Sequence, residues 1–368
     1  MLGTVVKTAT YLNEKHASFT SILSHFLYSE APVISPLPSH AVLAAAGPVH
    51  GNAVLFTNSG WLISGEGILE AFGGEGGVRS ALLINDFVGC GYGALTVDKE
   101  TECRALNGAT PVPGAPIACV GAGTGLGECF LTASGGDPAT YECFASEGGH
   151  AEFAPRTAVE FELLQHLKEK FGGRHRVSVE RVVSGTGLAN VYGFFAERFK
   201  EKRVERVFEE FQKAGSMQGR VVSVNASECE VCRMAMETFA GAYGSEVGVA
   251  GLKWIPRGGL YVTGGLTPKN IKWIEGEQSA FMQAYKDKGR VSKLLEEIPL
   301  FAVMEEDLGL RGSHMLAFKM LWEEKVKGGG RAGGGGGVGG GVGDVGKLLA
   351  AFSVGAALSL GLARSLRK

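Results

Sequence analysis

The feature that most constrains the fold lies between residues 116 and 131, where two apolar, strand-like runs flank the glycine-rich stretch GAGTGLG at 121–127. A dinucleotide-binding fingerprint needs glycines at its first, third and sixth positions, followed by a helix. Here the sixth position is Leu126, and the residues that follow are strand-like. No Gly-Lys-Ser/Thr follows either, which argues against a P-loop. Two interpretations stay open: an ordinary tight hairpin, or a strand-turn-strand whose backbone N–H groups and Thr124 hydroxyl cradle phosphate oxygens.

Two further motifs lie on either side of this stretch. The run LLIN at 82–85 leads into Asp86, as a buried strand that delivers an amide and a carboxylate to its tip would. The motif EGGH at 147–150 places a carboxylate and an imidazole around two glycines, which let the backbone come close to a ligand. Together the three motifs suggest a polar small molecule held beside a phosphate.

In this order the motifs resemble those of the bacterial-type glucokinase family, whose members have the sugar kinase/actin-like ATPase fold. The resemblance covers about residues 8–322 and includes four later segments: ERVVSGTGLAN at 180–190, YVTGGL at 261–266, KDKGR at 286–290 and LGLRGS at 308–313. It implies a two-domain α/β chain of the actin-like ATPase (ribonuclease H-like) class. The implied activity is that of a glucokinase, which transfers the γ-phosphate of ATP to the 6-hydroxyl of glucose at the start of glycolysis.

The resemblance also assigns roles to single residues. Asp86 is the candidate general base, because phosphoryl transfer through a loose transition state needs a positioned carboxylate rather than a strongly raised pKa. A helix N-cap is the structural alternative for Asp86, and a satisfied structural histidine is the alternative for His150. The family's sugar contacts match Asn85, Asp86, Glu147, His150 and Glu180, its phosphate contacts Gly123, Thr124 and Gly125, and its adenosine contacts Gly264 and Gly265.

The sequence departs from the family at the opening motif. Family members begin with a strand-turn-strand that carries Asp-x-Gly-Gly-Thr, wraps the phosphates of the nucleotide and orders the metal. This motif is absent from the sequence. Either the true start lies upstream or the protein has lost half of its phosphate grip, and the complete set of sugar-side residues favours an upstream start. The fold is therefore expected to be N-terminally incomplete, with inner strands missing from the small sheet, apolar faces left open, and poor folding or activity.

Chain length and composition predict the domain organisation. A chain of 368 residues is more than one core usually fills, which predicts two domains. We expect a small domain at 1–95, completed by a helix at 308–327, and a large domain at 96–307. Residues 328–347 are mostly glycine and predict a linker.

The tail at 348–368 begins with an uncharged run at 348–363. As a helix this run would span about 24 Å, which is short of the roughly 30 Å hydrocarbon thickness of a bilayer. A membrane contact, an interfacial helix and an artefact of gene prediction stay open for it.

Charge and cysteine content bear on partners and location. The sequence has 36 basic and 38 acidic residues and no long basic run in its globular part, which argues against nucleic acid as a partner. Its seven cysteines are odd in number and spread among apolar segments, which predicts reduced thiols and a cytoplasmic protein. A plastid location and tail anchoring to an organelle outer membrane are the alternatives. The expected partners are glucose and ATP, and a homodimer stays open.

Metal binding is expected only through the nucleotide. Glu147 and His150 have no third ligand at suitable spacing, and the CxxC at 229–232 favours two buried thiols over zinc or redox chemistry. Mg²⁺ is implied by ATP, and its usual aspartate would belong to the absent opening loop. Two alternative functions stay open: a catalytically impaired sugar-binding or membrane-tethered regulatory homologue, and a kinase for another hexose.

Local patterns predict several element boundaries. Ser18 is expected to cap a helix, and Thr157 a second one. Strands at 40–46 and 52–56 are expected to form a hairpin through a Gly/Pro turn. Ser227 and Glu230 form a candidate capping box, and Thr267-Pro268 a candidate helix start.

Overall fold

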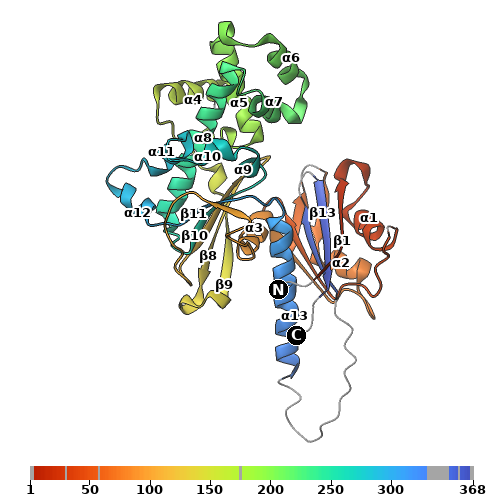
Figure 1. Ribbon diagram of the computed structural model, residues 1–368. Coiled ribbons are helices and arrows are strands. Elements are labelled where there is room, and N and C mark those ends of the chain that lie inside the picture. The colour runs from red at the N-terminus through yellow and green to blue at the C-terminus, as the bar shows by residue number, and fades with distance from the viewer. Residues whose placement is uncertain are drawn as a thin grey trace, which may run out of the picture. The chain divides into compact units, whose positions relative to one another are not determined.

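The computed structural model describes residues 4–29, 31–56, 59–173, 176–329, 348–354 and 357–364. The chain divides into two compact units (Figure 1). Unit 1 comprises Met1–Thr96 and Asp307–Lys368, and unit 2 comprises Val97–Glu306.

Unit 1 is built on a five-stranded sheet in the order β1-β13-β12-β2-β5. Strands β12, β2 and β5 run parallel, whereas β13 is antiparallel to both of its neighbours. A separate antiparallel pair joins β3 to β4. The elements are β1 (Thr4–Leu12), α1 (Phe19–Ser24), β2 (His40–Ala45), β3 (Ala53–Phe56), β4 (Trp61–Ser64), α2 (Gly65–Phe72), β5 (Ser80–Asn85), α3 (Asp86–Ala94), α13 (Leu308–Gly329), β12 (Leu348–Val354) and β13 (Ala357–Arg364).

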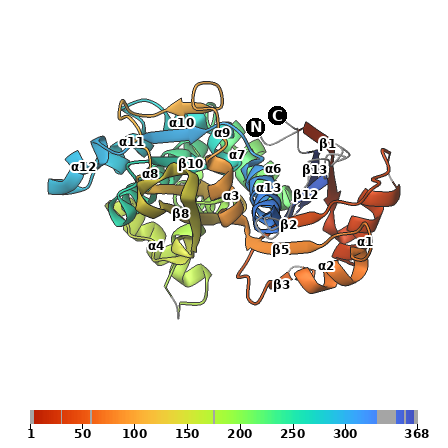
Figure 2. The same ribbon diagram turned by 90° about the horizontal axis from the view of Figure 1, so that it is seen from below.

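Strand β2 is buried along its whole length because side chains cover both of its faces. On one face, Leu43 belongs to a core that α1 and α2 share. On the other face, Ala44 lies against Gly89 of α3. Helices α3 and α13 pack closely: a Cβ on Gly93 would overlap the backbone of Leu308, and one on Gly312 would overlap the backbone of Gly89. Figure 2 shows α13 beside β12 and β2, which it contacts.

The C-terminal strands fill the inner positions of the unit 1 sheet. β13 pairs with β1 from Thr4↔Arg364 to Leu12↔Ala357, and β12 pairs with β2 from Leu349↔His40 to Val354↔Ala45. Figure 1 shows the blue β13 beside the red β1. The expectation of missing inner strands is therefore wrong, and so is a helix at 348–363, because cross-strand bonds satisfy this backbone instead. Among the described residues, the structure holds no helix long and apolar enough to cross a membrane.

Unit 2 is built on a six-stranded sheet in the order β6-β11-β10-β7-β8-β9. The central strands β11, β10 and β7 are parallel, and the pairs β7–β8, β8–β9 and β11–β6 are antiparallel. The strands are β6 (Cys103–Ala105), β7 (Ile117–Ala122), β8 (Leu126–Ala133), β9 (Tyr141–Ser146), β10 (Gly259–Thr263) and β11 (Leu300–Val303). The helices are α4 (Ala158–Lys170), α5 (Gly185–Arg198), α6 (Glu205–Lys213), α7 (Gln218–Val224), α8 (Glu230–Trp254), α9 (Leu266–Lys269), α10 (Ile271–Ile274), α11 (Ala280–Lys286) and α12 (Ser292–Glu296).

Helix α8 organises the core of unit 2. It packs against β7, α5 and α11, and its Tyr243 is fully buried, with a hydroxyl that donates to the carbonyl of Val120 at 3.2 Å. Close packing with α11 depends on glycines spaced one helical turn apart. A Cβ on Gly244 would overlap the backbone of Phe281, and one on Gly248 would lie 2.7 Å from the carbonyl oxygen of Tyr285.

Some local predictions are confirmed and others are wrong. Ser18 caps α1, Thr157 caps α4, and residues 121–127 form the predicted turn between two antiparallel strands. The expected hairpin of 40–46 with 52–56 is wrong, because β12 and β5 occupy both edges of β2 and β3 pairs with β4 instead. The predicted capping box of Ser227 and Glu230 is wrong, because Cys229 is the N-cap of α8. The predicted helix start at Thr267-Pro268 is also wrong, because α9 begins at Leu266 with Gly265 before it.

Candidate active site

Asn85 and Asp86 lie at the junction of β5 and α3 in unit 1. Asn85 is the N-cap of α3, and its Oδ1 accepts hydrogen bonds from the backbone N–H groups of Phe87 (2.9 Å) and Val88 (3.3 Å). Asp86 is therefore the first helical residue rather than the cap, and it is half-buried. Its Oδ1 accepts from the N–H of Phe87 at 2.9 Å. The junction therefore places the Asp86 carboxylate at the start of α3.

The turn between β7 and β8 carries Gly123, Thr124 and Gly125. The N–H of Gly123 donates to the carbonyl of Gly125 at 2.8 Å, which closes the turn on itself. The carbonyl of Gly123 accepts from the N–H of Gly185, the first residue of α5, also at 2.8 Å. Thr124 is exposed at the tip. The turn is thus held against the start of a helix, where anions bind readily.

Glu180 lies in a 3-10 turn, Val179–Arg181, just before α5. Its Oε2 accepts a hydrogen bond from the N–H of Leu126 at 2.9 Å. A Cβ on Gly125 would lie only 2.5 Å from the same oxygen. The carboxylate assigned to the sugar therefore also holds the end of the glycine turn.

Glu147 precedes the 3-10 turn Gly148–His150, which His150 ends and which is called the 148–150 turn below. His150 Nε2 lies 3.7 Å from Glu147 Oε2, and the two side chains are 56% and 65% exposed, so both can reach a ligand. The turn rests on β8: a Cβ on Gly148 would overlap the Glu128 carboxyl group, and one on Gly149 would overlap the Leu126 carbonyl.

Gly264 and Gly265 follow β10. Gly264 has a φ of +82°, and a Cβ there would overlap the backbone of Ala122 at the end of β7. Only glycine fits both the left-handed conformation and this close approach. Gly265 lies beside Glu306, whose Oε2 accepts from Lys269 Nζ at 2.8 Å.

A pocket of about 350 Å³ opens beside the β7–β8 turn. Gly185, whose N–H donates to the carbonyl of Gly123, lines this pocket. Apolar Phe208 and Phe211 and polar Thr186, Ser216 and Gln218 line it, a mixture that suits a flat, polar-edged molecule.

The structure thus divides the predicted residues between the two units. Asn85 and Asp86 belong to unit 1. The others lie in unit 2. There Glu180 bonds to Leu126 at the end of the 123–125 turn, the 148–150 turn packs on β8, and Gly264 packs against Ala122 of β7.

Comparisons with known proteins agree with the family resemblance of the sequence motifs. The glucokinase family profile matches residues 3–320 of the sequence. The chain belongs to the glucokinase family. As a glucokinase it is an ATP-dependent glucose phosphotransferase, in agreement with the activity predicted from its motifs.

Individual glucokinases show how far the similarity extends. The glucokinase of Synechocystis sp. is 36% identical over 321 residues, which cover 84% of this chain and 88% of the relative. That of Nostoc punctiforme is 37% identical over 299 residues, 78% of this chain and 84% of the relative. The crystal structure of a glucokinase from an Antarctic psychrotroph superposes with a TM-score of 0.62 at 26% identity, covering 83% of this chain and 87% of that one.

Two buried residues of the site region escaped sequence analysis. Glu128 of β8 and Glu246 of α8 are 1% and 8% exposed, yet both are carboxylic acids. In sequence, Glu128 is one carboxylate within a strand-like run, which reads as a solvent-facing position. Only the three-dimensional contact with the 148–150 turn gives it significance.

Proposed function

We propose that this glucokinase uses Asp86 as the general base that accepts the proton of the 6-hydroxyl of glucose as the γ-phosphoryl group of ATP is transferred. The observation that carries the proposal is the junction of β5 and α3. There Asn85 is the N-cap of α3, and Asp86, whose Oδ1 accepts a hydrogen bond from the N–H of Phe87, is held at the first position of the helix. A positioned, half-exposed carboxylate can take a proton from a bound hydroxyl group during phosphoryl transfer.

Sugar binding is assigned to Asn85, Glu147, His150 and Glu180 together with Asp86. Carboxylates accept hydrogen bonds from sugar hydroxyl groups, whereas an amide and an imidazole can either donate or accept. Two observations support this assignment. The side chains of Glu147 and His150 are exposed, and Glu180 bonds to Leu126 through one of its two carboxylate oxygens.

The nucleotide is assigned to the β7–β8 hairpin and the residues after β10, all in unit 2. The 123–125 turn would bind phosphate oxygens, and Gly264 and Gly265 would leave room for the adenosine, with the neighbouring pocket for its base. Mg²⁺ enters with ATP as part of the substrate, since it is typically held by phosphates, waters and one or two carboxylates. The described residues include no cluster of three His, Cys, Asp or Glu side chains that could bind a metal.

We further propose that β12 and β13 stand in for the opening strand-turn-strand of the family. They add an antiparallel strand pair inside the unit 1 sheet, between β1 and β2. Their connection, Gly355-Ala356 in sequence, carries no carboxylate. The pair would therefore complete the unit 1 sheet through a turn that carries no carboxylate.

Location and assembly remain proposals. We infer a reducing compartment, the cytoplasm, because all seven cysteines are buried and none forms a disulfide in the structure. A fluorescent fusion, with and without residues 348–368, would distinguish this from a plastid or an organelle surface. Light scattering of the purified protein would establish whether it forms a homodimer.

The test of the proposed base is Asp86→Ala and Asp86→Asn, with Glu66→Gln as the matched control. Glu66 also lies in the first turn of a unit 1 helix, α2, so its substitution removes a helix-terminal charge and nothing else. Turnover should fall by about 10²–10⁴ in both Asp86 variants. Calorimetric glucose affinity should be largely retained, and Glu66→Gln should be active.

Unchanged turnover in the Asp86 variants would remove this residue from the mechanism. Glucose binding without turnover in the unsubstituted protein would favour a catalytically impaired sugar-binding homologue. Faster turnover of another sugar in a substrate panel would favour a different hexose.

A further inference from the structure

Two buried carboxyl groups take no part in the proposed reaction: Glu128, which lies against the 148–150 turn, and its neighbour Glu246 on α8. Among the described residues, both carboxyl oxygens of Glu128 and the Oε1 atom of Glu246 lack a hydrogen-bond partner. An unsatisfied buried polar group costs several kcal/mol, and a buried unpaired charge costs more. Apolar side chains would therefore stabilise this part of the core better, which calls for another reason for the pair.

The position of Glu128 on its strand shows how unusual it is. Along β8, Leu126 and Phe130 on the same face as Glu128 pack into the apolar core of unit 2. The strand partners of Glu128 are Val120 of β7 and Ser146 of β9. Glu128 is thus a carboxylic acid at an apolar position of β8, and its strand partner Ser146 lies at the end of β9, shortly before the 148–150 turn.

The two carboxyl groups act on each other. Burial first, and the neighbouring Glu246 carboxylate second, raise the pKa of Glu128 far above its ordinary value. Burial also raises the pKa of Glu246, while Lys253 and Lys288 oppose this. Two adjacent carboxylates in a poorly solvated site cannot both ionise easily, so the pair retains a proton near neutral pH. That proton provides the hydrogen bond that the two carboxyl groups otherwise lack.

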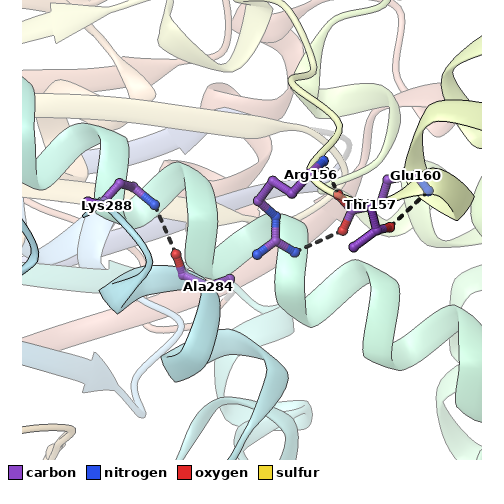
Figure 3. Close-up of polar contacts among 5 residues, drawn as sticks. All are labelled: Arg156, Thr157, Glu160, Ala284 and Lys288. Carbon is purple, nitrogen blue, oxygen red and sulfur yellow. Dashed lines mark hydrogen bonds and ion pairs between the residues drawn. The ribbon is translucent and has the colours of Figure 1, made fainter. Parts of the chain in front are cut away.

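Lys288 and the nearby Arg156 have partners of their own. Lys288 Nζ donates to the carbonyl oxygens of Ala284 at 2.9 Å and Asp287 at 3.3 Å. Arg156 is bound to Glu160, with its NH2 group 2.8 Å from Oε1. Figure 3 shows Lys288 directed at Ala284 and Arg156 directed at Glu160. Lys288 is itself half-buried, and burial followed by the nearby Arg156 lowers its pKa.

Close contact between β8 and the 148–150 turn leaves no room for a side chain at residues 148 and 149. Neither Gly148 nor Gly149 has a positive φ, so backbone conformation does not require glycine at these positions. A Cβ at 148 would overlap the Glu128 carboxyl group, and one at 149 would overlap the carbonyl of Leu126. The turn consequently rests directly on β8, and the Glu128 carboxyl group sets how closely it approaches.

We propose that Glu128 and Glu246 are positioning residues for glucose: the pair supports the 148–150 turn from beneath and so fixes the direction of Glu147 and His150. A second negative charge on the pair would push the two carboxyl groups apart, displace the turn and weaken glucose binding. The inference rests on the proposed function in taking Glu147 and His150 as sugar contacts.

The experiment compares Glu128→Gln, Glu128→Ala and Glu246→Gln with the unsubstituted protein from about pH 6 to about pH 9, the range in which the raised carboxyl titrates. Glucose KM, ATP KM and kcat are measured, and glucose affinity is measured separately by calorimetry. The amide of Gln keeps the volume of Glu128 and cannot ionise. Glu128→Gln and Glu246→Gln should therefore lose the rise in glucose KM that the unsubstituted protein shows on the alkaline side.

Glu128→Ala removes the support, so its glucose KM should rise on the order of tenfold to a hundredfold at every pH. Its ATP KM and kcat should change little. Glu160→Gln is the matched control, because Glu160 is a 4% exposed carboxylate of the same unit that does not touch the turn. It should keep the pH profile of the unsubstituted protein.

The proposal is overturned if Glu128→Gln keeps the original pH dependence of glucose KM, or if Glu128→Ala binds glucose with unchanged affinity. Thermal unfolding of each variant shows whether it folds, and Glu128→Gln remains informative where Glu128→Ala does not fold. Weakened glucose binding in Glu128→Ala together with full turnover in Asp86→Ala would reject the proposed base and leave this inference standing.

Discussion

The backbone N–H of Leu126 donates a 2.9 Å hydrogen bond to Oε2 of Glu180. This bond joins the first residue of β8 to a side chain just before α5, and a Cβ on Gly125 would lie 2.5 Å from the same oxygen. One carboxylate therefore contacts the end of the phosphate turn and is also assigned to the sugar. Under the proposed function, Glu180 thus links the sugar contacts and the phosphate contacts of unit 2.

The linkage predicts different effects for two substitutions of Glu180. Glu180→Ala should raise KM for both glucose and ATP by about tenfold, because a hydrogen bond to a charged group contributes about 1.5–3 kcal/mol. Glu180→Gln keeps an oxygen that can accept from Leu126, so it should raise glucose KM and leave ATP KM near its original value. Steady-state kinetics with each substrate varied in turn measures this, and Glu142→Ala on exposed β9 is the control. Equal effects of both variants on ATP would refute the linkage.

Gly148→Ala tests the close approach of the 148–150 turn to β8. A methyl group at 148 has no room beside the Glu128 carboxyl group, so we expect glucose KM to rise about tenfold or more. In a Glu128→Ala background the methyl group has space, and the second substitution should add little. A double-mutant cycle on calorimetric glucose affinity should therefore show coupling of about 1 kcal/mol or more. Additive effects would mean that the two residues do not share this space.

Stability should depend on pH through Glu128. Below about pH 4.5 both folded and unfolded chains hold its proton, and above it the unfolded chain releases the proton while the folded chain retains it, up to a pKa of about 8. The folded state then binds more protons, so the free energy of unfolding falls as pH rises through this window. The loss is a few kcal/mol at most. Urea unfolding of Glu128→Gln should show a weaker decline than the unsubstituted protein, and parallel curves would contradict this.

Removal of residues 348–368 should destabilise unit 1 selectively. It would take two inner strands from a five-stranded sheet and expose the edges of β1 and β2. We expect a loss above about 4 kcal/mol, enough to unfold the unit. Hydrogen exchange should show lost protection in β1, β2 and β5 with β7, β8 and β10 unaffected. Removal of residues 365–368 alone is the control, and normal protection of β2 in the longer truncation would show that the strands are dispensable.

Local sequence patterns were sufficient where neighbouring residues determine the structure. The apolar run before Asn85 predicts β5, and the glycines at 121–127 predict the β7–β8 turn, because strand formation and turn geometry depend on short segments. The family motifs added the roles of single residues such as Asp86 and Glu180, which no periodicity could indicate.

The remaining features depend on partners distant in sequence. The run at 348–363 has the composition of an apolar helix, and only pairing with β1 and β2 makes it two strands. The Gly/Pro turn after β2 suggested a hairpin, yet both edges of β2 were already occupied. The burial of Glu128 depends on its contacts with the 148–150 turn and with Glu246 of α8. In each case tertiary context overrode a reasonable local preference.

The strand order of unit 1 has a consequence for biosynthesis. Ribosomes add about 5–20 residues per second, so β2 would wait on the order of tens of seconds before its neighbour β12 is made. Unit 2 is synthesised without interruption within that interval and can fold first. The nascent chain would meanwhile present unpaired strand edges of β1 and β2, which makes this stage the point at which chaperones matter most for the yield of native protein.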